Sequence, residues 1–455
     1  MSILLSEIFK NKNLCFVDDV NRGKEIPISK FEFFDFPDEN KNIVFLYLDN
    51  SFEAIKIFFS FLKTQHVIAL LSPDIKENFK LELESIYKPL YIFDNNRRNI
   101  LDYSRYNKIF FRRNEELVIE IHSSIKLLLS TSGTTGSPKF VKLSEKNLLS
   151  NAVSIASYLP ITNSDITPLN LPIYYSYGLS VLTSNAIGGG KIICSNTDIL
   201  SKDFWDKFKL YGFTSISGVP FVYEMLERIG FTKKTYPTLK YLTQAGGKLQ
   251  ESVLRKFSEY SINNDIGFYV MYGQTEATAR IAYLPPSELK NKIGSIGIPI
   301  PNGKLRIDDA NNELCYSGPN VFGGYVNSLK DLTNYEQIDE LRTGDLALID
   351  SDGFYYITGR LKRFVKIFGS RVNLDELEVI ISKKIEKNIK CTGYKDLSIL
   401  LVTNEDGIDF KELIKFLSLE LKLHFSVFKS LSLKEYPLTS NGKIDYKQVI
   451  RIYES

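Results

Sequence analysis

One segment combines residue types that suit the binding of phosphate groups. Nine consecutive residues, Ser130 to Pro138, are all Ser, Thr, Gly or Pro; they follow an apolar run and end at Lys139. Glycines let backbone N–H groups approach anionic oxygens, hydroxyl groups donate hydrogen bonds, and the lysine adds a positive charge. A Walker A loop is excluded, because Pro138 stands where that loop, counted from Gly133, requires a second Gly. A flexible polar surface loop is the alternative.

The segment TSGTTGSPK (131–139) closely resembles the phosphate-loop motif of the adenylate-forming superfamily, which comprises acyl-CoA synthetases, carrier-protein adenylation domains and luciferase-like enzymes. Five further stretches resemble the motifs of this family, in the same order. They are QAGGKL (244–249), MYGQTEAT (271–278), RTGDLA (342–347), GRLKRFVKIFGSRVNLDELE (359–378) and PLTSNGKIDYKQV (437–449). The resemblance extends over most of the chain, and six ordered motifs make coincidence implausible.

The resemblance implies a two-step ligase that uses ATP and Mg²⁺. A small carboxylic acid would attack the α-phosphorus of ATP, giving an acyl-adenylate and pyrophosphate, and a thiol would then give a thioester and AMP. Because the acid and ATP are both anions, a metal ion and fixed positive groups must neutralise their repulsion. The thiol would be the phosphopantetheine of a carrier protein or of CoA.

The motifs assign three catalytic residues. Glu276 would bind Mg²⁺, which prefers hard oxygen ligands, and Thr275 would contact the phosphate. Lys443 would act as a point charge that stabilises the carboxylate and the α-phosphate oxygens during adenylate formation. Without the preceding residues of its motif, Lys443 would be one more exposed lysine in a lysine-rich chain.

Further residues are assigned to the nucleotide. Tyr272 would stack on adenine, although an aromatic residue there could also belong to the core. Asp345 would accept hydrogen bonds from the ribose hydroxyls, and Arg360 would reach ribose or phosphate. The other predicted nucleotide contacts are Ser130, Thr131, Ser132, Gly133, Thr134, Thr135, Gly136, Lys139, Gly246, Gly247 and Gly273.

The resemblance also implies two domains. An AMP-binding adenylation domain would span residues 1–361, and a mobile C-terminal domain carrying the catalytic lysine would span 362–455. Lys362, two places after the predicted nucleotide-binding arginine, would be the hinge about which the small domain rotates between the two steps. Many relatives have Asp at this position or the next, whereas this chain has Lys362 and Arg363.

The segment LPIYYSYGL (171–179) is where relatives bind the acid. Those that activate fatty or aryl acids often have His at the position of Tyr175, and amino-acid activators place an Asp nearby; neither is present. Tyr174, Tyr175 and Tyr177 therefore suggest a pocket for an uncharged organic acid, rather than one recognised by an ion pair. Packing of the tyrosines in the core is the alternative.

The acceptor and the reaction class have alternatives within the same fold. RVNLDELE and PLTSNGKID are closer to adenylation domains that load a carrier protein than to common CoA ligases. A luciferase-like adenylating monooxygenase and a non-catalytic nucleotide-binding protein are the alternative functions. The non-catalytic alternative is disfavoured, because a degenerate site would have lost some of its costly charges.

The pattern of apolar residues predicts the elements that position these motifs. The segment 42–50 reads as a buried strand, 51–65 as an amphipathic helix and 67–73 as the next strand, which together form a βαβ unit. The alternation returns further along the chain, so we expect an α/β fold of layered sheets with parallel pairs. After Lys290, turn residues separate short strands of a β-rich subdomain, and a small α+β domain follows from Asp350.

Composition excludes several classes of protein. The 455 residues are 44% hydrophobic and 24% charged, which excludes wholesale disorder, and a net charge of +3 makes nucleic acid an unexpected partner. The four cysteines have no CxxC spacing and the three histidines stand alone, so neither zinc nor a disulfide framework is expected.

A membrane segment and an export signal are also not expected. Residues 166–190 carry no charge, but their prolines, asparagines and a triple glycine disfavour a membrane-spanning helix. The N-terminal apolar patch is too short for a signal-peptide core. The prediction is a cytoplasmic enzyme without a transmembrane span.

Overall fold

The protein is described by a computed structural model that covers residues 2–19, 23–36, 40–106, 108–112, 119–131, 139–361, 363–367, 370–395, 398–439 and 443–455. The chain divides into two compact units. Unit 1 comprises Met1–Ile293, Gly297–Lys304 and Tyr316–Leu341, and unit 2 comprises Gly294–Ile296, Leu305–Cys315 and Arg342–Ser455. The functional boundary expected after residue 361 stays a prediction.

Unit 1 contains an eight-stranded sheet of order β19-β9-β8-β4-β3-β5-β7-β6. Its four central strands, β8, β4, β3 and β5, are parallel, and antiparallel strands complete both edges. Every residue of β3 and β4 is buried, as expected for central parallel strands covered on both faces. The strands are β3 (Ile43–Tyr47), β4 (Val67–Leu71), β5 (Tyr91–Asp94), β6 (Tyr103–Tyr106), β7 (Ile109–Arg112), β8 (Leu127–Thr131), β9 (Lys139–Leu143) and β19 (Tyr325–Val326).

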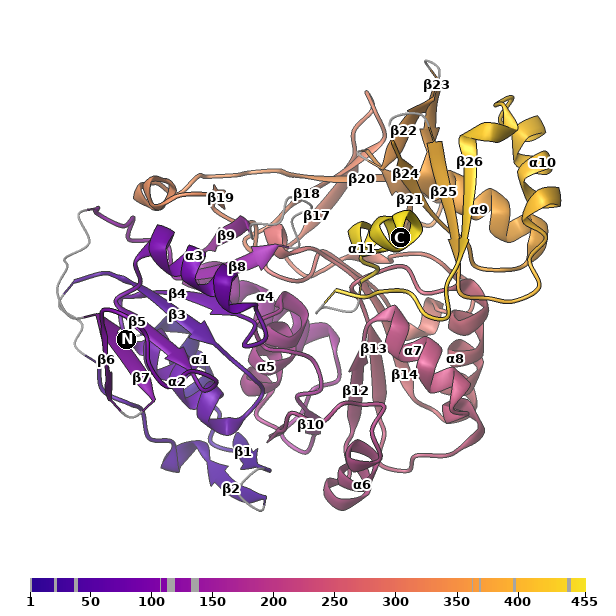
Figure 1. Ribbon diagram of the computed structural model, residues 1–455. Helices are drawn as coiled ribbons and strands as arrows, with labels where there is room; N and C mark the ends of the chain where they lie inside the picture. The colour runs from indigo at the N-terminus through magenta and orange to yellow at the C-terminus, as the bar shows by residue number, and fades with distance from the viewer. Residues whose placement is uncertain are drawn as a thin grey trace. The chain divides into compact units, whose positions relative to one another are not determined.

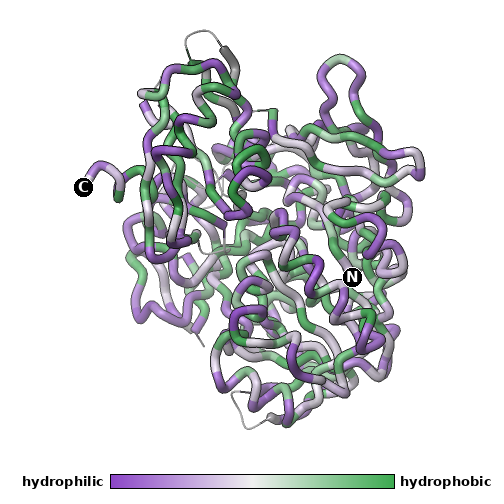
Figure 2. The backbone as a smooth tube through the Cα atoms, turned by 90° about the vertical axis from the view of Figure 1, so that its right-hand side faces the viewer, coloured by the Kyte–Doolittle hydropathy of each residue, from purple (hydrophilic) through white to green (hydrophobic). Residues whose placement is uncertain are grey.

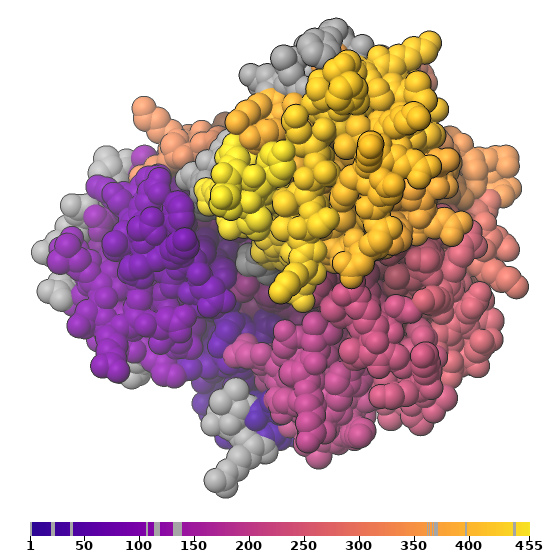
Figure 3. Space-filling view, turned by 45° about the vertical axis from the view of Figure 1, so that its right-hand side comes forward, coloured from indigo at the N-terminus to yellow at the C-terminus, as the bar shows by residue number. Residues whose placement is uncertain are grey.

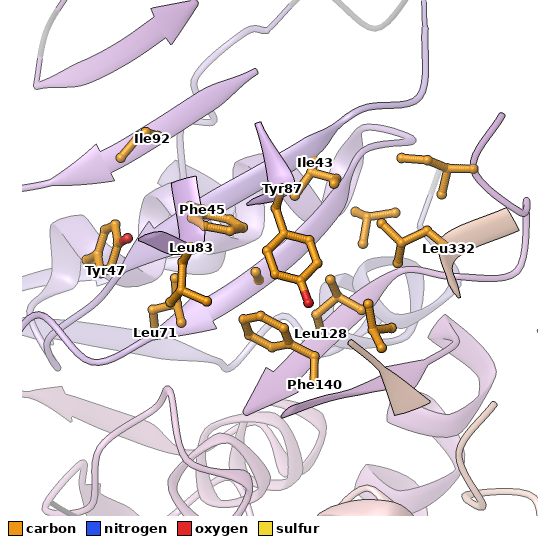
Figure 4. Close-up of a cluster of buried hydrophobic side chains, with 14 of the residues drawn as sticks. Ile43, Phe45, Tyr47, Leu71, Leu83, Tyr87, Ile92, Leu128, Phe140 and Leu332 are labelled. Atoms are coloured by element: carbon orange, nitrogen blue, oxygen red, sulfur yellow. The ribbon is translucent and has the colours of Figure 1, made fainter. Parts of the chain in front are cut away.

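The predicted βαβ unit is confirmed. Helix α2 (Phe52–Lys63) connects the parallel strands β3 and β4, and the Ser51 hydroxyl caps it by accepting a hydrogen bond from the Ala54 amide. Helices α1 (Ile3–Lys10) and α3 (Glu77–Tyr87) also belong to this part of the chain. Figure 4 shows the core beside the sheet, where the rings of Tyr87 and Phe140 meet edge to face with centroids 5.4 Å apart.

A second sheet in unit 1 has five strands in the order β12-β13-β14-β15-β16. Figure 1 shows α4 and α5 on one side of it and α7 and α8 on the other. The first three strands are parallel and the last two antiparallel. These elements are β12 (Ser215–Gly218), β13 (Tyr241–Gln244), β14 (Gly267–Tyr272), β15 (Ala282–Leu284), β16 (Ile298–Pro299), α4 (Glu145–Tyr158), α5 (Ser176–Gly188), α7 (Pro220–Arg228) and α8 (Glu251–Asn263).

The uncharged stretch 166–190 forms a strand, a loop and one helix of 13 residues, as its breakers predict. Among the described residues, no helix is long and apolar enough to cross a membrane. Figure 2 agrees, since hydrophobic and hydrophilic residues alternate over short distances. The strand joins a small sheet of β10 (Ile166–Pro168), β11 (Lys191–Cys194), β1 (Cys15–Asp18) and β2 (Lys24–Pro27), and α6 (Lys202–Tyr211) follows.

Unit 2 contains most of a four-stranded sheet and a separate α+β segment, as predicted. The sheet has β17 (Lys304–Ile307), β18 (Glu313–Ser317), β20 (Leu341–Ile349) and β21 (Tyr355–Arg360). The hairpin of β22 (Phe364–Ile367) and β23 (Ser370–Asn373) follows, and then a sheet of β24 (Lys390–Tyr394), β25 (Ser398–Thr403) and β26 (Phe428–Ser432). One face of β25 packs in a cluster with α9 (Leu374–Ile385) and α10 (Phe410–Glu420), and the other packs with α11 (Tyr446–Glu454).

Short 3-10 helices occur at Ile28–Lys30, Phe231–Lys233, Thr275–Ala277, Pro286–Glu288, Leu329–Thr333 and Phe425–Val427.

Candidate functional site

The predicted phosphate-binding segment connects two antiparallel strands of the eight-stranded sheet. Ser130 pairs with Phe140 and Thr131 with Lys139 in the β8–β9 register, so Lys139 begins the returning strand. This geometry holds both ends of the segment on the sheet. The predicted contacts Ser132, Gly133, Thr134, Thr135 and Gly136 lie outside the described residues.

Lys139 and Glu276, which are far apart in the sequence, are joined through Tyr325. The Nζ atom of Lys139 lies 5.9 Å from the centroid of the Tyr325 ring, and the Tyr325 hydroxyl donates a hydrogen bond of 2.9 Å to Oε1 of Glu276. Tyr325 is placed by strand β19, where it pairs with Val141 of β9. Burial and the Glu276 carboxylate raise the pKa of Tyr325, so its hydroxyl stays a donor.

A tight turn positions Glu276 after β14. A Cβ atom on Gly273 would stand 1.9 Å from the carbonyl oxygen of Ala279, so no other residue fits there without moving the backbone. The amide of Ile281 donates to the carbonyl of Tyr272 at 2.9 Å and closes the turn. Within it, Thr275 and Glu276 lie in the short helix Thr275–Ala277.

Buried Asn320 fixes the backbone of the same turn. Its Nδ2 donates to the carbonyl oxygens of Ala277 and Arg280, each at 2.8 Å, and its Oδ1 accepts from the Tyr316 hydroxyl at 2.7 Å. The Thr278 hydroxyl donates to the Asn320 carbonyl at 2.8 Å and supports a residue whose φ is +63°. The sequence reasoning missed Asn320, because only folding brings it to the motif.

The carboxylate of Glu276 fits a magnesium ion. Mg²⁺ usually keeps several waters and is held by one or two carboxylates together with substrate phosphates. Among the described residues, no group of three or more His, Cys, Asp or Glu side chains could hold a metal. A single carboxylate, that of Glu276, is enough for Mg²⁺ when phosphates and waters supply the other ligands.

The second Gly-rich segment follows β13. Gly246 has a φ of +89°, which favours glycine, and a Cβ atom there would stand 3.5 Å from the Tyr175 hydroxyl. The side-chain amide of Gln244 donates to the Gly247 carbonyl at 2.9 Å. Tyr175, the residue preceding α5, therefore lies against a segment predicted to contact the nucleotide.

The three predicted pocket tyrosines have different surroundings. Tyr177 is 2% exposed, and its hydroxyl is 2.9 Å from both the carbonyl and the hydroxyl of Thr243. Tyr174 interacts with Ser72 at the end of β4. Burial raises the pKa of all three hydroxyls. Tyr177 of α5 is thus packed against β13, and Tyr175 borders the nucleotide segment.

Asn50 holds the segment that leads to these tyrosines. Its Nδ2 donates to the carbonyl oxygens of Leu169 and Leu171 at 2.7 and 2.9 Å, and its Oδ1 accepts from the Ile173 amide at 3.0 Å. Asn50 itself follows β3, so the eight-stranded sheet positions the segment.

In unit 2, the two residues assigned to ribose and phosphate are neighbours. Asp345 pairs with Arg360 across β20 and β21, and Nε of Arg360 lies 2.8 Å from Oδ1 of Asp345. The Asp345 side chain is only 5% exposed, whereas that of Arg360 is 62% exposed. The Asp345 backbone is held by Thr343, to whose hydroxyl the Asp345 amide donates at 3.1 Å.

The predicted hinge residue, Lys362, lies outside the described residues. Its neighbour Arg363 is anchored inside unit 2. The Arg363 guanidinium forms ion pairs with Asp375 and Glu378, and it donates to the Tyr446 hydroxyl at 2.8 Å. It also donates to the Cys391 carbonyl at 2.8 Å. The side chain that follows the predicted hinge is therefore held by several elements.

The predicted catalytic lysine lies at the end of a small hairpin in unit 2. The Thr439 amide donates to the Lys443 carbonyl at 2.7 Å, and the Lys443 amide donates to the Thr439 hydroxyl at 3.2 Å. Lys443 is exposed and precedes α11, whose bright yellow residues lie at the surface in Figure 3. The turn residues 440–442 lie outside the described residues.

Curated proteins with similar sequences are CoA ligases. The chain is 28% identical to oxalate–CoA ligase from Arabidopsis thaliana over 346 residues, which cover 71% of this chain and 66%, just under two thirds, of that protein. It is also 28% identical to 2-succinylbenzoate–CoA ligase from Bacillus cereus over 360 residues, covering 75% and 73% of the two chains.

Solved structures share the fold over nearly the whole chain. The o-succinylbenzoate CoA synthetase from Bacillus subtilis in complex with its acyl-adenylate has a TM-score of 0.75 at 19% identity, covering 98% of this chain and 97% of that one. ATP-bound MatB from Rhodopseudomonas palustris has a TM-score of 0.77 at 18% identity, covering 100% and 99%. A family model described as AMP-binding enzyme matches residues 102–326. Residues 102–326 thus match the AMP-binding enzyme model, and the chain is similar to CoA ligases in sequence and to a CoA synthetase solved with its acyl-adenylate in fold.

Proposed function

We propose that this protein is an AMP-forming acid–thiol ligase. It activates a carboxylic acid with ATP as the acyl-adenylate, with release of pyrophosphate, and then transfers the acyl group to a thiol as a thioester. The observation that carries the proposal is the connection of Lys139, Tyr325 and Glu276 at the end of the hairpin with the phosphate-loop motif. A positive group and an anionic metal ligand are what a magnesium-bound triphosphate requires.

The residues of unit 1 hold the nucleotide and the metal in this proposal. Glu276 binds Mg²⁺, which supplies charge neutralisation on the phosphates when bound, and Thr275 and Lys139 contact the phosphate oxygens. Tyr325 orients the Glu276 carboxylate through its hydrogen bond. Tyr272 stacks on adenine, and Gly246, Gly247, Gly273 and residues 130–136 contact the nucleotide.

Three residues of unit 2 have roles in this proposal. Asp345 accepts hydrogen bonds from the ribose hydroxyls, and Arg360, its ion-pair partner, contacts ribose or phosphate. Lys443 stabilises the charge that develops during adenylate formation. Residues 1–361 act as the adenylation domain and 362–455 as a mobile domain with its hinge at Lys362.

We propose CoA as the acceptor, because the similar curated proteins are named as CoA ligases. The segments RVNLDELE and PLTSNGKID keep a carrier protein as the second candidate acceptor. Both acceptors end in the same phosphopantetheine thiol, so one chemical step serves either partner.

The test is acid-dependent pyrophosphate release with MgATP over short, medium and long fatty acids, aryl acids, hydroxy acids, dicarboxylic acids and amino acids. Release with one class supports the proposal, and thioester assays with CoA and with a phosphopantetheinylated carrier protein then identify the acceptor. ATP binding without pyrophosphate release for every acid, with either acceptor present, would contradict it.

A further inference from the structure

A buried arginine that the sequence analysis did not single out lies beside the predicted acid pocket. Arg280 is 3% exposed and stands four residues after Glu276, at the end of the turn that Asn320 fixes. Its guanidinium lies 4.1 Å from the centroid of the Tyr177 ring, and its charge opposes the rise in pKa that burial causes at Tyr175. Arg280 therefore contacts one of the three predicted pocket tyrosines and acts electrostatically on a second.

The charge of Arg280 has no anionic partner among the described residues. No carboxylate of these residues forms an ion pair with it, and its Nε is buried without a hydrogen-bond partner. The guanidinium interacts with the ring of Tyr177 and the hydroxyl of Tyr158, and its Nη1 has only a long contact of 3.4 Å with the Ala279 carbonyl. A buried cation with neutral neighbours is costly unless an anion joins it.

The unpartnered Nε atom belongs to a residue that lines a small pocket. The pocket lies between α4, α5 and the five-stranded sheet, and Arg280, Tyr177, Ser180, Thr243 and Tyr241 are among its lining residues. The Tyr241 hydroxyl likewise has no hydrogen-bond partner among the described residues. The pocket volume is about 10 Å³, the space of about one water, so it suits the terminal oxygens of a ligand and not a whole acid.

Resting on the proposed function, we infer that the acid carries a second anionic group, a carboxylate in the simplest case, which Arg280 binds while the other carboxylate is activated. Tyr175 relates the two ends, since its hydroxyl senses the charge of Arg280 and borders Gly246 of the predicted nucleotide segment. The uncharged acid expected from residues 171–179 alone is replaced by a diacid, because the recognising charge comes from another segment. Guanidinium and carboxylate match in geometry and charge, and the pairing leaves no buried charge unbalanced.

The test compares linear and aromatic dicarboxylic acids with their half-amides, in which one carboxylate becomes a neutral carboxamide. The wild-type enzyme should release pyrophosphate with a kcat/KM at least about 100-fold higher for the diacid, because the half-amide leaves Arg280 without its anion. Arg280→Met should reduce this ratio to below about fivefold by raising KM for the diacid. KM for ATP should stay within about twofold of the wild-type value. Arg280→Lys should retain part of the preference.

Arg255→Met is the matched control, since Arg255 is exposed and, among the described residues, pairs with Glu251 alone, on its own helix. It should keep the wild-type ratio. Thermal unfolding shows whether Arg280→Met folds. If it does not fold, the comparison of diacid and half-amide with the wild-type enzyme decides whether a second anionic group is recognised. The inference would be overturned, and the proposed function left intact, by three results together. Pyrophosphate would be released with monocarboxylic acids that carry no second charged group, diacids would not be preferred, and Arg280→Met would not change kcat/KM. No release with any acid, despite ATP binding, would overturn both.

Discussion

The Tyr325 hydroxyl donates a hydrogen bond of 2.9 Å to Oε1 of Glu276, across 49 residues of sequence. The same ring lies 5.9 Å from the ammonium group of Lys139. One aromatic side chain thus connects the predicted metal ligand to the predicted phosphate-binding lysine, and it comes from neither motif.

Tyr325→Phe should weaken the use of MgATP. The ring beside Lys139 is retained, while the carboxylate of Glu276 loses the donor that orients it. Because Tyr325 is 42% exposed, a loss of about 1 kcal/mol is expected, which is about fivefold in kcat/KM for MgATP. Pyrophosphate release as a function of Mg²⁺ and ATP concentration measures it. Wild-type kinetics in this variant would show that the hydrogen bond does not orient Glu276.

Asn320→Ala should destabilise unit 1 and slow catalysis together. The substitution leaves the buried carbonyls of Ala277 and Arg280 without donors, which costs about 2–3 kcal/mol of unfolding free energy. Chemical denaturation measures the loss, with exposed Asn291→Ala expected within about 0.5 kcal/mol of wild type. Equal stability of the two variants would argue against the role given to Asn320.

Arg363→Ala should loosen unit 2. Its ion pairs with Asp375 and Glu378 and its bond to Tyr446 are lost, which costs about 2–4 kcal/mol for a largely buried pair. Hydrogen exchange of the β24–β26 amides measures local opening. Arg255→Ala, which removes an exposed pair, should leave exchange unchanged. Unchanged protection in Arg363→Ala would contradict the anchoring role.

Lys41 should make stability depend on alkaline pH. Its Nζ donates to the carbonyls of His122 and Ser123, and burial lowers its pKa from 10.5 to about 8. Between these values the unfolded chain holds a proton that the folded chain has released, so this group makes the unfolding free energy rise with pH. Below about pH 8 both states are protonated, and burial of the charge costs stability.

The comparison with Lys41→Met isolates this contribution. The unfolding free energy of wild type minus that of the variant should increase from about pH 7.5 to about pH 9.5, as measured by urea denaturation. A difference that stays constant over this range would show that the folded pKa of Lys41 is not lowered.

The sequence predicted the elements that depend on local patterns. The buried strands β3 and β4 and the helix between them follow from runs of apolar residues, and the turn at Gly273 lies inside a recognisable motif. Contacts made by distant segments were not predictable in this way. Tyr325, Asn320 and Arg280 acquire their neighbours only when β19, the turn after β14 and α5 pack together.

The burial of Arg280 is one result of contacts between distant segments that local sequence patterns do not predict. An arginine among apolar residues gives no sign of whether its charge meets a carboxylate, solvent or a ligand. The absence of an Asp or a His in 171–179 predicted a pocket for an uncharged acid, and this reasoning took no account of Arg280, which contacts Tyr177 from a segment about one hundred residues later.

The central claim, formation of an acyl-adenylate, is tested most directly by acid-dependent exchange of labelled pyrophosphate into ATP. Wild type should show exchange that requires the acid, and Lys443→Ala should lower its rate about 100-fold or more while ATP affinity stays within a few-fold. Lys447→Ala, an exposed lysine of α11, is the matched control and should exchange at the wild-type rate. Exchange in Lys443→Ala at the wild-type rate, or no exchange in wild type with any acid, would contradict the account.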